Sequence, residues 1–342
     1  MIALYILALL ACFVILARVV DLFFISSLDK ISKDLKLSSD AAGATLMAVG
    51  SSAPELFVAL FAVLKPGDHQ VIGIGSIVGS AIFNLLVIVG AVALIKKSKL
   101  TWQPVVRDLI FYTAAVVLLV WFIWDGSFTI NEAAIFLGIY VLYVFAAIYW
   151  RKILPYNDMK IDKNEGVHGE KNKITKPIDW FLTLIFPAPK HYYLNFIFSI
   201  LIIAALSYVL VEVAIHSAHI LNIPEAIIAL TVLAVGTSIP DLLSSIIVAR
   251  QGRGDMAVSN AVGSNIFDIL IGLGLPFLIV LAVSGGSVST GGDLKSSGII
   301  LFASVILLFV LLLFSKWKVG KFTGILLIGL YIFYVVREII IL

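Results

Sequence analysis

Long apolar stretches alternate with short polar ones along the chain. A stretch of about 20 apolar residues is long enough to cross a bilayer as an α-helix. The second, third, seventh and eighth stretches are unusually rich in Gly, Ser and Thr, and the second and seventh carry a proline near the middle. The pattern predicts ten spanning helices: Ile2–Phe24, Leu37–Leu64, Val71–Ile95, Asp108–Trp124, Asn131–Trp150, Tyr192–Ile215, Pro224–Ala249, Met256–Val283, Ser297–Phe314 and Phe322–Leu342.

The composition also indicates a membrane protein. Of the 342 residues, 61% are hydrophobic and only 13% are charged, whereas soluble domains carry about 25% charged residues. A soluble globule cannot hide so much apolar surface from water. The composition therefore excludes a soluble enzyme, a nucleic-acid binder, a disordered chain and a disulfide scaffold. It predicts an all-α polytopic membrane protein.

The basic residues predict the orientation in the membrane. Cytoplasmic loops of membrane proteins carry an excess of Lys and Arg. If the N-terminus lies outside, 20 of the 24 basic residues fall on the inner side, Arg107 among them as a loop residue. We therefore expect an integral membrane protein of the plasma membrane, with both termini outside and the loop 151–191 in the cytoplasm.

This long loop divides the chain into two sets of five spans. Residues 1–150 form a first five-helix repeat and residues 192–342 a second. Within the loop, the composition of Ile178–Phe186 is typical of a segment that lies along the membrane surface. Because each half has an odd number of spans, the two halves insert in opposite directions. This is the inverted-repeat arrangement of secondary transporters.

The two halves resemble each other where they are least ordinary. Thr45–Leu56 (TLMAVGSSAPEL) aligns without gaps on Thr231–Leu242 (TVLAVGTSIPDL). Gly79–Asn84 (GSAIFN) aligns in the same way on Gly263–Asp268 (GSNIFD). The shared order of Gly, Ser or Thr, Ser, any residue, Pro and an acid is specific. We therefore interpret the matches as an internal repeat.

The proline motif carries its own chemistry. Pro54 has no N–H group and its ring clashes with the carbonyl of Gly50, so the helix must kink or break there. A carbonyl oxygen that loses its donor inside lipid needs another partner. Ser51 and Glu55 lie four residues apart on one helical face. Hydroxyl, carboxylate and carbonyl oxygens together suit hard cations such as Ca²⁺ or Na⁺, and the absence of His and Cys from these motifs argues against zinc, copper or iron.

The second motif adds a flank to the same site. Its polar residues again stand four apart, and its glycines permit close helix packing. We expect a central cluster of four helices whose midpoint holds three acids. A carboxylate at mid-membrane costs roughly 3 kcal/mol, and three together repel one another unless cations or protons compensate them. A structural proton-sharing pair or neutralisation by arginine are the alternatives, but no Lys or Arg lies inside these four spans. The residues concerned are Glu55, Asp241 and Asp268 as the acids, Ser80, Asn84 and Ser264 beside them, and Gly75, Gly79 and Gly263.

These motifs resemble the α-repeats of the cation/calcium exchanger superfamily, and most closely its sodium/calcium exchangers. The potassium-dependent sodium/calcium exchangers are the nearest branch, since Glu55 pairs with Asp241 and Ala81 replaces the Asn of a GSN motif. The resemblance implies a Na⁺/Ca²⁺ antiporter of ten helices with a Ca²⁺ site centred on Glu55 and Asp241. It implies these cation ligands: Glu55, Asp241, Asp268, Asn84, Ser51, Ser52, Thr237, Ser238, Ser80, Ser264 and the backbone oxygens near Ala48 and Ala234.

Charge counting leaves the need for K⁺ open. Three ionised acids are balanced by Ca²⁺ with one K⁺, or by three Na⁺. If Asp268 is protonated, K⁺ is not required. We therefore expect Asp268 to decide whether the exchanger depends on K⁺.

Other functional classes follow less well from the same residues. A proton-coupled Ca²⁺ exchanger of the same fold is the main alternative, followed by a passive cation channel and an intramembrane aspartyl protease using Asp241 and Asp268. We expect a transporter and not an enzyme. We expect no prosthetic group and no nucleic acid, and the sequence identifies no protein partner. The expected partners are the lipid bilayer and the transported Na⁺ and Ca²⁺, with K⁺ added if the exchanger depends on it.

Overall fold

The computed structural model describes residues 2–35, 48–67, 69–95, 98–156, 175–250, 252, 254–290 and 294–340. Residues 37–47, which begin the second predicted span, lie outside this part of the chain. So do residues 157–174, which make up the polar part of the loop 151–191.

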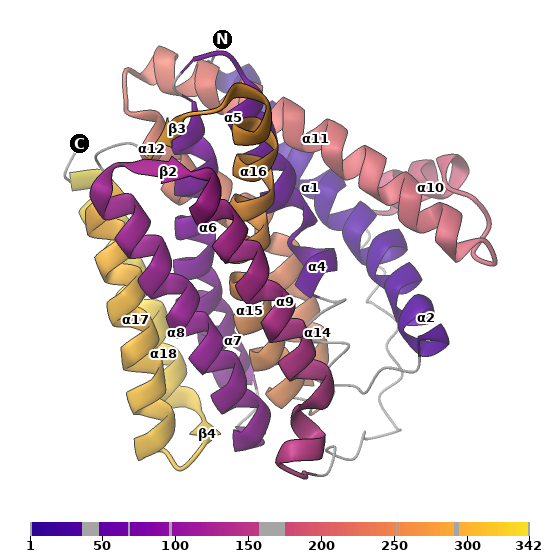
Figure 1. The fold of residues 1–342 in the computed structure, drawn as a ribbon. Helices are drawn as coiled ribbons and strands as arrows, with labels where there is room; N and C mark the ends of the chain where they lie inside the picture. Colours follow the sequence, from indigo (N-terminus) through magenta and orange to yellow (C-terminus); the bar gives the residue numbers. More distant parts are fainter. Residues whose placement is uncertain are drawn as a thin grey trace.

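The first half is a run of long helices (Figure 1). The second predicted span is described from its proline motif onward, as two helices separated at Ser52. In chain order the helices are α1 (Ile2–Val19), the π-helical η1 (Val20–Ile25), α2 (Ser26–Asp34), α4 (Ala48–Ser51), α5 (Ala53–Leu64), α6 (Gln70–Phe83), the π-helical η3 (Asn84–Ile88), α7 (Val89–Ile95), α8 (Trp102–Asp125) and α9 (Ile130–Ile153).

The second half follows one additional short helix, α10 (Lys176–Ile185). In the second half, the proline-containing span bends by 40° at the break between Thr237 and Ile239. The remaining helices are α11 (Tyr192–Leu221), α12 (Glu225–Ile228), the π-helical η4 (Ala229–Leu233), α13 (Ala234–Thr237), α14 (Ile239–Arg250), α15 (Gly254–Phe267), the π-helical η5 (Asp268–Leu273), α16 (Gly274–Ser284), α17 (Lys295–Phe314) and α18 (Lys321–Ile340).

The prediction of an all-α polytopic membrane protein is confirmed. In the described residues, eight helices are long and apolar enough to cross a membrane, and the bent α12–α14 segment is a ninth. Two short antiparallel ribbons, which the hydrophobic pattern did not predict, each join one half to the other. They are β1 (Ser98–Lys99) with β4 (Lys318–Val319), and β2 (Ser127–Thr129) with β3 (Ser287–Ser289).

The glycine- and serine-rich spans form the centre of the molecule. Of the 18-residue apolar stretch in the span Gln70–Ile95, 83% is buried inside the protein, and the corresponding share in Gly254–Ser284 is 61%. In the peripheral span Ile130–Trp150 only 22% is buried. Gly79 of α6 faces the backbone carbonyl of Leu230, and a methyl group added to Gly79 would lie 2.7 Å from Cβ of Ala234. The absence of a side chain at Gly79 therefore lets the two halves pack closely at the centre.

The prediction that Arg107 lies in an inner loop is wrong. Helix α8 begins at Trp102, because Pro104 is tolerated in the first turn of a helix, where no N–H bond is required of it. Arg107 is fully buried in the next turn, and its Nη2 lies 2.7 Å from Oδ1 of Asp108. The two opposite charges neutralise each other, so the polar pair belongs to the helix interior and not to its end.

Candidate cation-binding site

The two proline motifs break their helices in the same way. Ser52 (φ −93°, ψ 6°) separates α4 from α5, and Ser238 (φ −85°, ψ 3°) separates α13 from α14. The backbone oxygens of Ala48 and Ala234 accept bonds from the amides of these serines at 3.0 and 3.3 Å. A carbonyl oxygen has two lone pairs, so each of these oxygens retains acceptor capacity beyond that bond.

The structure brings the three predicted acids together. Glu55 lies in the first turn of α5, Asp241 in the first turn of α14, and Asp268 is the first residue of η5. All three are fully buried, and one carboxylate oxygen from each lies within 4.8 Å of the others. The breaks thus place Glu55 and Asp241 at helix N-termini, where the helix dipole stabilises negative charge.

No basic side chain compensates this charge among the described residues. The ion pairs found there involve other acids. Three acids this close inside a membrane protein are stable only if cations or protons balance them. The cluster therefore has the electrostatic requirement of a cation site.

Each half supplies hydrogen bonds to the acid of the other half. Oγ of Ser238 donates to Oε1 of Glu55 at 3.1 Å. Nδ2 of Asn84 donates to Oδ2 of Asp241 at 3.1 Å. The polar residues predicted on each repeat therefore meet across the molecule, and neither half forms the cluster alone.

The remaining serines extend the network. Oγ of Ser264 donates to Oδ1 of Asp241 at 3.0 Å and lies 3.4 Å from Oγ of Ser51. Oγ of Ser80 lies 2.8 Å from Oγ of Ser238 and donates to Oδ2 of Asp268 at 3.4 Å. These contacts connect the carboxylates of Asp241 and Asp268 to serines of both halves.

Several oxygens at the cluster have no hydrogen-bond partner within the described part of the chain. They are Ser52 Oγ, Glu55 Oε2, Asn84 Oδ1 and Asp268 Oδ1, all buried. Thr237 differs, because its hydroxyl donates to the carbonyl of Leu233 in its own helix at 2.9 Å. Buried oxygens without donors are costly in a protein interior. A hard cation with oxygen ligands would satisfy them.

Asn84 and Asp268 share a backbone feature that the sequence did not reveal. Each is the first residue of a π-helical segment, η3 and η5 respectively. Such wider turns occur frequently at functional sites. Because Asn84 and Asp268 begin the same kind of segment in their two halves, we regard them as counterparts.

Sequence reasoning missed the residues that fix α15 beside the site. Nδ2 of Asn265 donates to the carbonyl of Ala81 at 3.0 Å and lies 2.9 Å from the hydroxyl of Tyr112. Asp108 accepts bonds from Ser259 of α15 and from Tyr143 of α9. An aspartate within an otherwise apolar span was the available signal, and the misplaced start of α8 concealed it.

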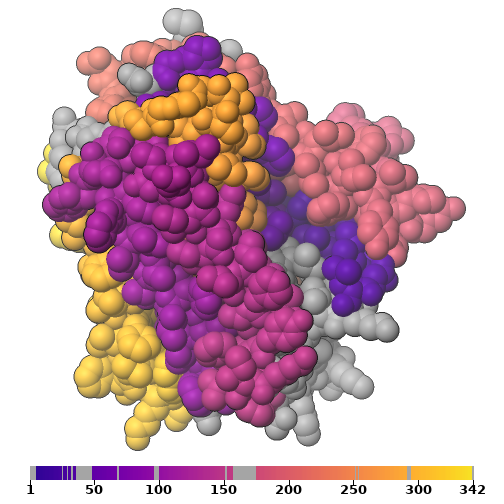
Figure 2. Space-filling view, in the orientation of Figure 1, coloured from indigo at the N-terminus to yellow at the C-terminus, as the bar shows by residue number. Residues whose placement is uncertain are grey.

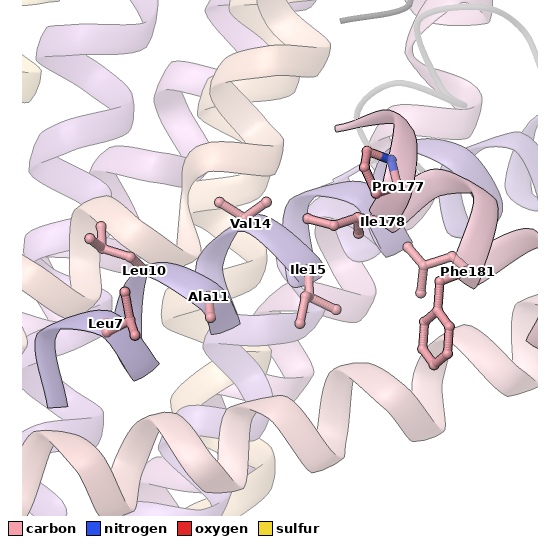
Figure 3. Close-up of a pocket in the computed structure, with 9 residues that line it drawn as sticks. Leu7, Leu10, Ala11, Val14, Ile15, Pro177, Ile178 and Phe181 are labelled. Atoms are coloured by element: carbon pink, nitrogen blue, oxygen red, sulfur yellow. The ribbon is translucent and has the colours of Figure 1, made fainter. Parts of the chain in front are cut away.

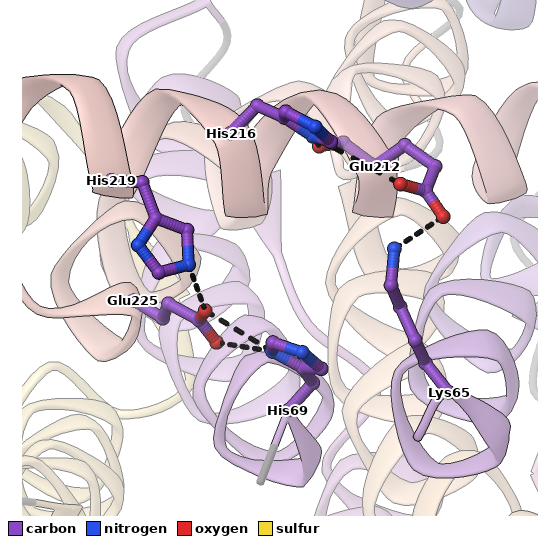
Figure 4. Close-up of polar contacts among 6 residues, drawn as sticks. All are labelled: Lys65, His69, Glu212, His216, His219 and Glu225. Atoms are coloured by element: carbon purple, nitrogen blue, oxygen red, sulfur yellow. Dashed lines mark hydrogen bonds and ion pairs between the residues drawn. The ribbon is translucent and has the colours of Figure 1, made fainter. Parts of the chain in front are cut away.

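A second polar cluster lies away from the acids, where α5, α6, α11 and α12 end or begin (Figure 4). Lys65 forms an ion pair with Glu212, and Nδ1 of His69 lies 3.0 Å from Glu225. His216 and His219 are largely exposed beside them. These contacts connect α11 to the ends of α5 and α12.

Comparison with known proteins agrees with these features. The profile of the family described as sodium/calcium exchanger protein matches residues 5–149 and 191–340. Sodium/potassium/calcium exchanger 5 of Homo sapiens is 34% identical over 95% of this chain and 80% of its own length. Sodium/potassium/calcium exchanger 2 of Gallus gallus is 29% identical over 98% of this chain and 77% of its own length. The solved sodium-calcium exchanger NCX_Mj has the same fold, with a TM-score of 0.64 at 24% identity over 98% of this chain and 99% of its own.

Proposed function

Since the chain belongs to the sodium/calcium exchanger protein family, whose members are membrane transporters and not enzymes, we propose that it exchanges Na⁺ for Ca²⁺ at the buried acid cluster. The observation that carries the proposal is the meeting of Glu55, Asp241 and Asp268, from both halves, without a basic partner in the described residues. Among the described residues, the cluster offers only oxygen ligands, as Ca²⁺ and Na⁺ prefer.

In this proposal Glu55 and Asp241 bind Ca²⁺ directly, and Na⁺ competes for overlapping oxygens. Asp268 adds a third negative charge, which K⁺ balances when Ca²⁺ is bound. The curated relatives named above are sodium/potassium/calcium exchangers, which favours this assignment. The other ligands are the predicted ones: Ser51, Ser52, Ser80, Asn84, Thr237, Ser238, Ser264 and the carbonyls of Ala48 and Ala234.

Transport then proceeds by alternating access. The long α1 and α11 slide against the central helices and open the site to one side at a time. On the α1 side the contacts near the breaks are apolar: Phe13 of α1 lies against Gly236, and Phe24 of η1 against Gly50. On the α11 side, Oγ of Ser207 donates to the carbonyl of Pro54 at 3.4 Å and Glu212 pairs with Lys65, so movement of α11 has to break these directional contacts. An empty cluster of unpaired carboxylates is unfavourable in a low dielectric, so exchange of one ion for the other is enforced.

The proposed membrane arrangement follows from the charges. Residues 1–150 and 192–342 form inverted five-helix halves, with both termini outside and the loop 151–191 in the cytoplasm of a cell whose plasma membrane holds the protein. The start of α1 and the end of α18 lie at the end of the bundle opposite β4 (Figure 1), which agrees with termini on one side. Labelling of single cysteines placed at Lys152 and Lys295 from either side of a sealed membrane tests this arrangement.

Flux into proteoliposomes tests the function. We expect an outward Na⁺ gradient to drive uptake of radioactive Ca²⁺, and a protonophore to leave uptake unchanged. Uptake that follows the proton gradient instead would identify the proton-coupled exchanger. The Glu55→Gln variant should lose uptake, whereas Glu338→Gln should retain it, because Glu338 is a buried acid that pairs with Arg337 away from the cluster.

A further inference from the structure

An apolar groove opens between α1 and the short helix α10 (Figure 3). Its volume is about 580 Å³, within the roughly 300–1,000 Å³ typical of small-ligand pockets. Leu7, Leu10 and Val14 line it from α1, and Pro177, Ile178 and Phe181 from α10. None of the described side chains that line it carries a charge or a hydrogen-bonding group. A polar ligand therefore has no partner in this groove.

Helix α10 is held in place at one end of the groove. Asp179 accepts bonds from Nε and Nη2 of Arg18 at 2.7 and 3.0 Å, and Arg18 also pairs with Asp21. Leu182 is buried against the bundle, while Trp180 and Phe181 are 68% and 56% exposed. The helix and the adjoining part of α11 stand out from the main body (Figure 2). The groove is thus a fixed feature with a polar boundary at Arg18 and an apolar floor beyond it.

We propose that this groove binds an acyl chain of a phospholipid from the leaflet that α10 borders. The wall formed by α1 belongs to a helix long and apolar enough to span the membrane, so the surrounding medium is hydrocarbon. Trp180 has the amphipathic character of residues found at the membrane interface. The exposed Lys176 beside Pro177 provides a positive charge for the phosphate of the headgroup.

The neighbouring part of the chain is a poor occupant. Residues 157–174 contain four Lys, two Asp and two Glu. Burying such residues in a groove without polar partners is unfavourable. A bound acyl chain instead covers the exposed Leu7 and Leu10 and packs against α1 and α10 together, which couples the lipid to a helix that moves in the proposed transport cycle.

Photolabelling tests the proposal on the intact protein in liposomes. A phosphatidylglycerol with a photoreactive acyl chain is incorporated into the liposomes. The liposomes are irradiated, and the labelled peptides of the protein are quantified. We expect each exposed residue in 7–15 and 177–182 to carry several-fold more label than each exposed residue of the lipid-facing α18. The variant Ala11→Trp fills the groove and should lower this label several-fold. The control Ala303→Trp, at an exposed alanine of α17, should leave it unchanged.

Two further measurements keep the test decisive. Phe181→Ser makes the groove polar without filling it and should also reduce the label, and monodisperse elution of each variant shows that it is folded. Equal labelling of the groove and α18, or labelling of Ala11→Trp at the parent level, would overturn the proposal. Cross-links between two protein copies through residues 7–15 would overturn it as well, because a second chain would then occupy the groove. These outcomes do not depend on ion exchange.

Discussion

The two halves share a backbone but not a set of side chains. Both break at a serine before a proline and both begin a π-helical segment at the last residue of the second motif. At that last residue the first half has Asn84, whereas the second half has Asp268. The first half therefore contributes one carboxylate to the cluster and the second half contributes two. The repeat builds a symmetric frame, and the side chains give it an asymmetric charge.

A second difference between the halves concerns the position of the helices and not the charge of the cluster. Asn265 of the second half bonds to the carbonyl of Ala81, which is its own counterpart in the first half. Only one of the two positions carries a polar side chain, and that side chain connects the halves. The asymmetry at 84 and 268 thus sets the charge of the site, whereas the asymmetry at 81 and 265 fixes the relative position of α6 and α15.

The largest expected effect comes from removing the carboxylate that follows the proline, in one half or in the other. Glu55→Gln and Asp241→Asn each remove a proposed direct ligand of Ca²⁺. We expect Na⁺-driven Ca²⁺ uptake to fall by at least about 100-fold, the upper end of what loss of an outer-shell partner causes at metal sites. Uptake in proteoliposomes at matched protein insertion measures this. Near-parental uptake in either variant would contradict equal roles for the two acids.

Making the halves alike at the asymmetric position tests the charge difference. Asp268→Asn copies Asn84 into the second half. We expect this variant to exchange Na⁺ for Ca²⁺ without K⁺, while uptake by the parent requires K⁺, because the third charge is gone. Initial uptake rates with K⁺ present and absent measure the difference. A parent protein indifferent to K⁺ would refute the role given to Asp268.

The anchoring of α15 by α8 predicts a large loss of stability. Asp108→Asn removes the carboxylate that pairs with the buried Arg107, and breaking a buried ion pair typically destabilises a protein by about 3–5 kcal/mol. The matched variant Asp125→Asn alters an exposed turn at the other end of the same helix and should change stability by less than about 1 kcal/mol. Thermal unfolding in detergent compares them. Equal unfolding temperatures would show that the buried pair does not anchor the helix.

The smallest effect is expected where the halves touch without polar side chains. Gly79→Ala forces a methyl group against Leu230 and Ala234 and should cost about 1–3 kcal/mol, as overpacking does. Gly329→Ala adds the same methyl group where nothing lies within 4 Å, and it should be neutral or slightly stabilising. Thermal unfolding of both variants measures the contrast. Equal unfolding temperatures for the two variants would show that the central packing tolerates a side chain at residue 79.

Glu55 and Asp241 were predictable from the sequence because the proline repeat marks this acidic position twice. Proline before an acid implies a helix break with a carboxylate beside it, and the order of the spans brings the two copies together. Three contacts were not predictable. Asp179 binds Arg18 across 161 residues of chain, Asn265 reaches the carbonyl of Ala81, and Arg107 is buried beside Asp108. Each depends on tertiary packing, and hydropathy alone begins the span at Asp108 and leaves Arg107 in the loop.

The central claim is that Na⁺ and Ca²⁺ compete for the same buried carboxylates. Calorimetric titration of the purified protein with Ca²⁺ at increasing Na⁺ tests it most directly. We predict that the apparent dissociation constant for Ca²⁺ rises steadily with Na⁺ in the parent, and that Glu55→Gln shows no measurable Ca²⁺ binding at any Na⁺ concentration. Ca²⁺ affinity that is independent of Na⁺, or preserved in Glu55→Gln, would contradict the account.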